Sequence, residues 1–249
     1  MSAEETWSRR LVKWLNQSGD PIQTIRAVDQ AADRIRASIL DGAHPAGSRL
    51  PPERVLAEAL GISRLTLRAA LARLEAEGLV QPRQGSGVLV LDYREHGGVG
   101  LLIHLLERGD LRLFEPFLRL RRVLAAEALA LATERITPDE LEELANWADQ
   151  LAQILDPGEL MAGNLDFSRR ILQLADNLPM ALLFNTVTQV VRGRPEVQAL
   201  MLSDPTAVRA SFPAIVALLR GGDPERARAV VQGMLATIDR ASLDTLESP

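Results

Sequence analysis

Between residues 51 and 78, two short helical segments are joined by almost no chain, and this spacing restricts the folds open to the sequence. Pro51 suits the first turn of a helix, and Glu53 complements the helix dipole there. Gly61 ends that helix, and Ser63 is a favourable N-cap for the next one, which runs to Gly78. Two helices joined by so tight a glycine-containing turn are typical of the helix-turn-helix motif.

The flanking segments complete a winged helix. Apolar residues recur at helical spacing from Ile25 to Ile39, which predicts a preceding helix. After Gly78, the apolar segments 79–81 and 88–91 enclose a polar, glycine-containing stretch, which predicts a β-hairpin. The sequence therefore predicts an extension at 1–22, a winged-helix DNA-binding domain at 23–91 and a glycine-containing linker at 92–100.

From residue 101 to 249 the pattern is helical almost throughout, with breaks at glycine- and proline-containing positions. The residues expected to cap helices here are Asp110, Thr137, Asp204 and Asp223. We expect a mainly α protein, with the winged helix followed by an antiparallel bundle of six or seven helices. The extension is predicted to hold a short amphipathic helix with Trp7, Leu11, Trp14 and Leu15 on one face. Packing of this face on the chain's own body is favoured over docking to a partner or a membrane surface.

Composition excludes several classes of protein. Hydrophobic residues make up 47% of the chain and charged residues 24%, as in globular domains, and no apolar run reaches the ~18 residues of a membrane-spanning helix. The lack of cysteine excludes disulfide scaffolds, thiolate zinc sites, iron–sulfur clusters and cysteine nucleophiles. The polar N-terminus does not read as a secretory signal, so we expect a cytoplasmic protein. The net charge of −5 is concentrated beyond Asp92.

The second helix of the motif carries residues suited to DNA. Arg64 and Arg68 are four positions apart and so share one helix face, away from the inward-facing leucines. Hydroxyl groups at 63 and 66 can reach phosphate oxygens, and the glycines of the hairpin tip allow a close approach to the backbone or minor groove. The predicted DNA-contacting residues are Arg54, Ser63, Arg64, Thr66, Arg68, Arg83, Gln84, Gly85 and Ser86.

These segments resemble the DNA-binding domain of GntR-type bacterial transcription regulators. The resemblance covers about residues 25–91 and is carried by the stretches Gly47–Arg54, Ile62–Leu74, Glu77–Leu79 and Gly85–Val88. It implies operator contacts by Arg54, Ser63, Arg64, Thr66 and Arg68, and a wing tip at Gln84, Gly85 and Ser86. Leu65 stands where some relatives carry a polar residue, and Gln84 where some carry histidine.

The helical second half is similar to the FadR subgroup, whose C-terminal domain binds a small effector and usually dimerises. Its better-known members hold a divalent metal with one aspartate and three histidines. Alignment on Phe167, Ile171 and Asn177 places Asn164 and Ser168 at the first pair of these ligands. Alignment on Ile215, Asp223 and Ala227 places Phe212 and Met234 at the other two. None of the four is a usual ligand for zinc, nickel or manganese.

The histidines support the same expectation, because His44, His96 and His104 all precede the helices that would hold the metal. The resemblance then implies a domain without metal or cofactor, with an apolar pocket for an acyl-CoA or organic acid. A pocket filled by its own side chains is the alternative. Arg121 matches a position where relatives place an arginine toward the effector carboxylate, and a buried arginine needs an anion or a paired acid.

Together these features predict a ligand-responsive, sequence-specific regulator that binds a near-palindromic DNA operator as a homodimer and is not an enzyme. In one alternative, the C-terminal domain only dimerises or binds a protein partner; in another, the winged helix itself contacts protein. The family's aminotransferase-fused branch needs a Schiff-base lysine, and Lys13 is the only lysine in the sequence. A branch with an α/β effector domain is disfavoured, because no alternating strand pattern follows residue 101.

Overall fold

The computed structural model describes residues 21–83, 85–108 and 111–247, and the chain divides into two compact units between Leu101 and Leu102. Each unit is described by itself. The predicted amphipathic helix containing Trp7 and Trp14, the wing residue Gln84 and the cap Asp110 lie outside the described residues.

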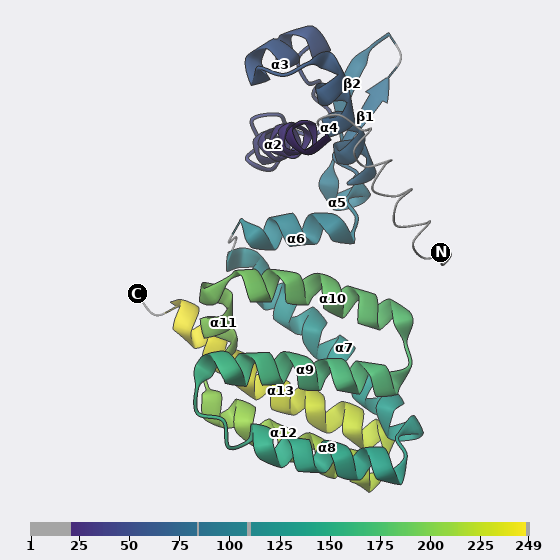
Figure 1. Cartoon of the computed structure of the whole chain (residues 1–249), viewed down its shortest axis with the longest axis vertical. Coiled ribbons are helices and arrows are strands. Elements are labelled where there is room, and N and C mark those ends of the chain that lie inside the picture. Colours follow the sequence, from purple (N-terminus) through teal and green to yellow (C-terminus); the bar gives the residue numbers. More distant parts are fainter. Residues whose placement is uncertain (1–20, 84, 109–110, 248–249) are drawn as a thin grey trace, which may run out of the picture. The chain divides into compact units, whose positions relative to one another are not determined.

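The N-terminal unit is a winged helix (Figure 1). Its elements are α2 (Pro21–Leu40), α3 (Glu53–Leu60), α4 (Arg64–Ala76), β1 (Val80–Arg83), β2 (Gly87–Val90) and α5 (Tyr93–His96). The two strands pair antiparallel, with Val80 opposite Val90, and Arg49 adds an isolated bridge to Leu89. The predicted helix, helix-turn-helix and hairpin are all confirmed.

The turn between α3 and α4 has the chemistry that its sequence predicts. Gly61 takes a left-handed conformation, φ 68°, and its N–H bonds to carbonyls of the last turn of α3. The hydroxyl of Ser63 accepts a hydrogen bond from the N–H of Thr66 at 3.0 Å and so caps α4. Leu67, Leu71 and other apolar residues of α4 are buried, which fixes the rotation of this helix about its axis.

Arg36 joins α2 to the end of α4. Its guanidinium donates to both carboxylate oxygens of Glu77, at 2.7 and 2.6 Å, and to Asp33 at 2.5 Å. Burial favours the neutral form, but these hydrogen bonds and opposite charges outweigh it and raise the pKa of Arg36. The first and last helices of the helix-turn-helix region are therefore held by a buried, fully charged cation.

The segment 92–100, expected as a linker, contains α5 and the start of α6 (Val99–Glu107). Asp92 caps α5 by accepting from the N–H of Arg94 at 2.9 Å. Gly78 has φ 75°, and a Cβ atom there would collide with the backbone carbonyl of His96. Only glycine allows α5 to end this close to the turn after α4.

The C-terminal unit is all-helical in its described residues, which confirms the predicted bundle. After the 3-10 turn η1 (Leu111–Leu113) come α7 (Phe114–Arg135), α8 (Pro138–Leu151), α9 (Pro157–Ala175), α10 (Leu178–Gly193), α11 (Pro195–Met201), α12 (Pro205–Gly221) and α13 (Pro224–Glu247). Figure 1 shows long helices stacked in layers, and α7 packs against both α9 and α13. Within the described residues, no helix is long and apolar enough to cross a bilayer.

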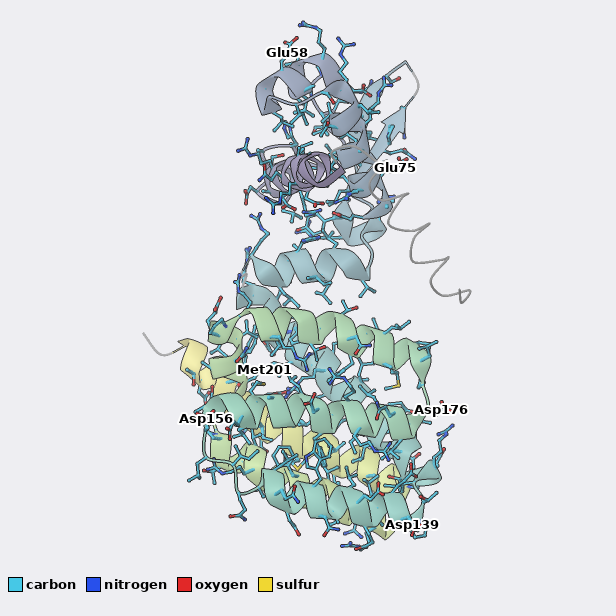
Figure 2. The ribbon with its side chains drawn as sticks, in the orientation of Figure 1. Glu58, Glu75, Asp139, Asp156, Asp176 and Met201 are labelled. Carbon is cyan, nitrogen blue, oxygen red and sulfur yellow. The ribbon has the colours of Figure 1, made fainter. Side chains whose placement is uncertain are left out.

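Side-chain caps start most of these helices. The predicted caps Thr137, Asp204 and Asp223 each accept a backbone N–H three residues ahead, as do Asp156, labelled in Figure 2, and Asn177. Proline usually follows in the first turn, where its missing N–H is not needed. Each break in the sequence thus sets both the end of one helix and the start of the next.

Candidate nucleic-acid interface and ligand cavity

The outward face of α4 presents two arginines to solvent. Arg64 and Arg68 are exposed, whereas Leu67 and Leu71, on the opposite side, are 0% and 3% exposed. This is the arrangement that the helical spacing predicts. The first turn of α4 contains no acidic residue, so its exposed end is suited to a polyanion.

Two of the predicted DNA-contacting arginines are ion-paired within the unit. Arg68 Nε lies 2.9 Å from Glu53 Oε2, and Arg54 Nη1 lies 2.8 Å from Glu58 Oε1. All four side chains are more than a third exposed, and exposed pairs contribute only ~0–1 kcal/mol. Phosphate can therefore compete for these guanidinium groups at little cost. Arg64 has no ion pair within the part of the chain described.

Ser63 and Thr66 engage each other. Their hydroxyl oxygens are 2.8 Å apart, and the side chain of Ser63 already caps α4. Thr66 is 9% exposed, whereas Ser63 is exposed. The structure thus gives Thr66 a place in the local hydrogen-bond network of the cap, and leaves Ser63 as the more accessible hydroxyl.

The wing tip combines glycine turns with cations. Gly85 and Gly87 have φ 73° and 82°, and Arg83 is exposed at the end of β1 with its Nε donating to Gln81 at 3.3 Å. Arg49, which sequence reasoning missed, donates to the backbone carbonyl of Ser86. Arg49 lies in the loop before α3, and its bridge to Leu89 of β2 brings it to the wing. The one sequence feature that could have indicated this role is its place just before the helix-turn-helix.

The C-terminal unit contains a cavity of about 150 Å³ among α7 and the five helices α9 to α13. Its wall is mainly apolar and includes Phe117, Leu129, Phe167, Phe184, Val187 and Met201, the last labelled in Figure 2. The polar lining residues are Arg121, Asn164, Ser168, Thr188 and Ser211. Three of the five predicted effector-binding residues, Arg121, Asn164 and Ser168, therefore meet at one cavity.

The hydroxyl groups of this wall donate to their own helices. Ser168 donates to the carbonyl of Asn164 at 2.8 Å, Thr188 to that of Asn185 at 3.0 Å and Ser211 to that of Val208 at 2.7 Å. With these donors engaged, Arg121 and the side-chain amide of Asn164 are the groups best able to bind a polar ligand atom.

Arg121 is tied to a buried acid. Asp239 of α13 is 1% exposed and accepts from both Arg121 and Arg122 of α7, the latter at 2.6 Å. The Nε atom of Arg121 is buried and has no hydrogen-bond acceptor among the described residues. The expected paired acid for this arginine is thus present, and one of its donors remains unused.

Phe212 and Met234 do not line the cavity. Phe212 is 0% exposed, and its ring meets that of Phe167 edge-on, with centroids 5.2 Å apart. Met234 packs at the edge of the same core. Phe212 therefore supports the cavity wall through Phe167. Among the described residues, no group of three or more His, Cys, Asp or Glu side chains is arranged to hold a metal ion.

Comparison with known proteins matches both units. Residues 27–90 fit the model of the gntR family of bacterial regulatory proteins, and residues 117–237 fit that of the FCD domain. An uncharacterized HTH-type transcriptional regulator of Mycobacterium tuberculosis is 32% identical over 227 residues, which cover 90% of this chain and 94% of the relative. The chain belongs to the GntR family.

Two further similar proteins are also described as transcription regulators. The HTH-type transcriptional regulator Mce2R of M. tuberculosis is 30% identical over 92% of this chain and 96% of its own length. A putative L-lactate dehydrogenase operon regulatory protein of Escherichia coli is 48% identical over 65 residues, 26% of this chain and 25% of that protein. This GntR-family protein is a transcription regulator, with a helix-turn-helix domain followed by an FCD domain, and not an enzyme.

Proposed function

We propose that this GntR-family regulator binds a near-palindromic operator as a homodimer, in the cytoplasm, and responds to a small ligand in its FCD domain. The observation that carries the proposal is the outward face of α4, where Arg64 and Arg68 are exposed and the leucines anchor the helix from behind. A recognition helix of this kind reads bases in the major groove, while Arg83 and the wing glycines approach the neighbouring backbone.

The cavity supports a metal-free ligand site. Its apolar wall fits an apolar body, and the two polar lining residues Arg121 and Asn164 fit one acidic or carbonyl end. A volume of about 150 Å³ resembles that of an engineered cavity that takes up benzene. Of the two ligand classes expected, a small organic acid is therefore favoured over an acyl-CoA, whose nucleotide portion would have to lie outside.

Arg121 connects this site to the helix packing. A ligand carboxylate on Arg121 would compete with Asp239, which joins α7 to α13. Binding would then redistribute the contacts between these helices, and a ligand that prefers one arrangement shifts the population toward it. In a dimer, such a shift would change the spacing of the two DNA-binding units and so the affinity for the operator.

Selection of bound duplexes from a random pool by the full chain tests the proposal. We expect enrichment of an inverted repeat, and a change in its affinity when benzoate or hexanoate is present. Arg121→Gln should keep the DNA binding and lose the response. Failure to retain any duplex at low salt, or enrichment without a repeat, would contradict the proposal.

One observation favours a second function, in which the FCD domain only dimerises or binds a protein partner. Asp239 already neutralises charge on Arg121, so that arginine does not require a ligand. A panel of organic acids and acyl-CoAs separates the two, because a bound ligand raises the unfolding temperature. A panel without any stabilising compound would favour the second function.

A further inference from the structure

Leu65 is a large apolar residue of the recognition helix α4, and its side chain is exposed to solvent. It is 80% exposed, whereas the other leucines of α4, Leu67, Leu71 and Leu74, are at most 3% exposed. It follows Arg64 directly and, on a helix, lies beside Arg68, three positions on. At 80% exposure, this apolar side chain within the arginine face contributes little to the packing of the described residues of the unit.

The surface around Leu65 is shaped for close approach. Four and seven positions further on, in the same stripe of the helix, are Ala69 and Ala72, both exposed. Alanine side chains add almost no bulk, so nothing on this stripe keeps the helix away from a groove. The first turn of α4 has no acid, and the flanking cations suit phosphate. Duplex DNA is thus the occupant that fits this face.

The major groove offers one apolar group to a side chain of this kind, the 5-methyl group of thymine. Guanidinium groups read guanine and phosphate, but leucine offers no hydrogen bond to any base edge. We propose that Leu65 is a specificity-determining residue, which selects thymine at one position of each half-site by packing on its methyl group. This inference rests on the proposed DNA binding by α4.

Replacement of thymine by deoxyuridine tests the contact, because it removes only the methyl group. With the operator selected by the wild-type chain, each thymine of a half-site is replaced in turn, and affinities are measured for wild type and Leu65→Ala. We expect one position at which deoxyuridine weakens wild-type binding about fourfold, equivalent to ~0.8 kcal/mol for one buried carbon group, and leaves Leu65→Ala unaffected.

Val55→Ala is the matched control, since Val55 is a 43% exposed aliphatic residue on the neighbouring α3. This variant should keep the full fourfold sensitivity. Equal sensitivity of wild type and Leu65→Ala at every thymine, or half-sites without thymine, would overturn the inference while leaving the proposed function intact. If the chain retained no duplex at all, the proposed function would fail first.

Discussion

Arg64 and Arg54 are exposed arginines near the starts of neighbouring helices, but their surroundings differ. Arg54 pairs with Glu58 one turn along α3, and both side chains are more than 60% exposed. Arg64 stands at the first position of α4, directly after the Ser63 cap, beside the apolar stripe of Leu65. From these positions we expect Arg64, on the recognition helix, to read bases and Arg54, on the helix before it, to bind phosphate.

Arg64→Ala should weaken binding to the selected operator by ~1–3 kcal/mol and relax the preference at one base pair. Arg54→Ala should weaken binding to all duplexes about equally and lower the slope of log affinity against log salt by about 1 for each copy bound. Fluorescence anisotropy at several salt concentrations measures both. If Arg64→Ala weakened binding to every sequence alike, the assignment of base reading to this residue would be wrong.

Gly78 and Gly61 have similar backbone conformations but different surroundings, so alanine at the two positions separates backbone strain from steric collision. Both have positive φ, 75° and 68°, but a Cβ atom meets the carbonyl of His96 at Gly78 and only open space at Gly61. Gly61→Ala should lower the free energy of unfolding by ~1–2 kcal/mol, and Gly78→Ala by a further ~1–3 kcal/mol from the collision. Urea unfolding followed by circular dichroism compares them; equal losses would show that α5 moves aside without cost.

At the scale of elements, the FCD unit depends on how α7 is fixed against α13. The two helices run antiparallel, because Arg121 and Arg122 of α7 pair with Asp239 of α13, and Glu127, further along α7, pairs with the earlier Arg228 of α13 at 2.8 Å. Asp239 is nearly inaccessible, so water compensates little of its charge, and within the described part of the chain its ion-pair partners are the two arginines. In the proposed response, Arg121 of this pairing both binds the ligand and takes part in the packing of α7 against α13.

Asp239→Asn should destabilise the protein by about 3 kcal/mol, because it leaves two largely buried guanidinium groups without a counter-charge. Glu142→Gln is the control, since Glu142 pairs with Arg220 at 2.9 Å on the surface, with both side chains more than half exposed. That pair should contribute under ~1 kcal/mol. Chemical unfolding of both variants makes the comparison, and similar losses would contradict the buried role of Asp239.

The capping box of α8 predicts that the stability of the folded protein depends on pH. The backbone N–H and hydroxyl of Thr137 hydrogen-bond to the carboxylate of Glu140 and lower its pKa. Because the pKa is lower in the folded state, this stabilisation is present above the ordinary glutamate pKa and is lost as pH falls through the folded value. In Glu140→Gln, the unfolding temperature should therefore fall less steeply as the pH is lowered into the acid range. Glu143→Gln, which changes a residue beyond the first turn of α8, should not have this effect.

For the whole molecule, the proposed response couples a ligand in one unit to DNA bound by the other. Such coupling needs only that the ligand prefer one of two arrangements. Among the described residues, no group of three or more His, Cys, Asp or Glu side chains could hold a metal ion, so we expect the response to be independent of metal. Dialysis against EDTA should therefore leave both the unfolding temperature and the operator affinity unchanged. A ligand present at 100 times its dissociation constant should still add ~2.7 kcal/mol of stability after that dialysis. Loss of the response on chelation would contradict the metal-free site.

The sequence by itself determined the order of the elements and the ends of many of them, although it predicted a linker where the structure has α5 and the start of α6. Gly61, Ser63, Thr137 and Asp204 act through the backbone of their own helix, so their effect is local and can be read from residue type and spacing. The outward placement of Arg64 and Arg68 follows in the same way from helical periodicity. Part of the cavity was predictable too, because Asn164 and Ser168 share one face of α9.

Only the tertiary structure decided which distant residues meet. Asp239 reaches Arg121 across 118 positions of the chain, and Arg49 reaches the wing across 37. Phe212 turns out to support the cavity wall, because its ring is buried against Phe167. The physical reason is range: caps and periodicity arise within a turn or two of backbone, whereas partners and cavity walls depend on how whole helices pack.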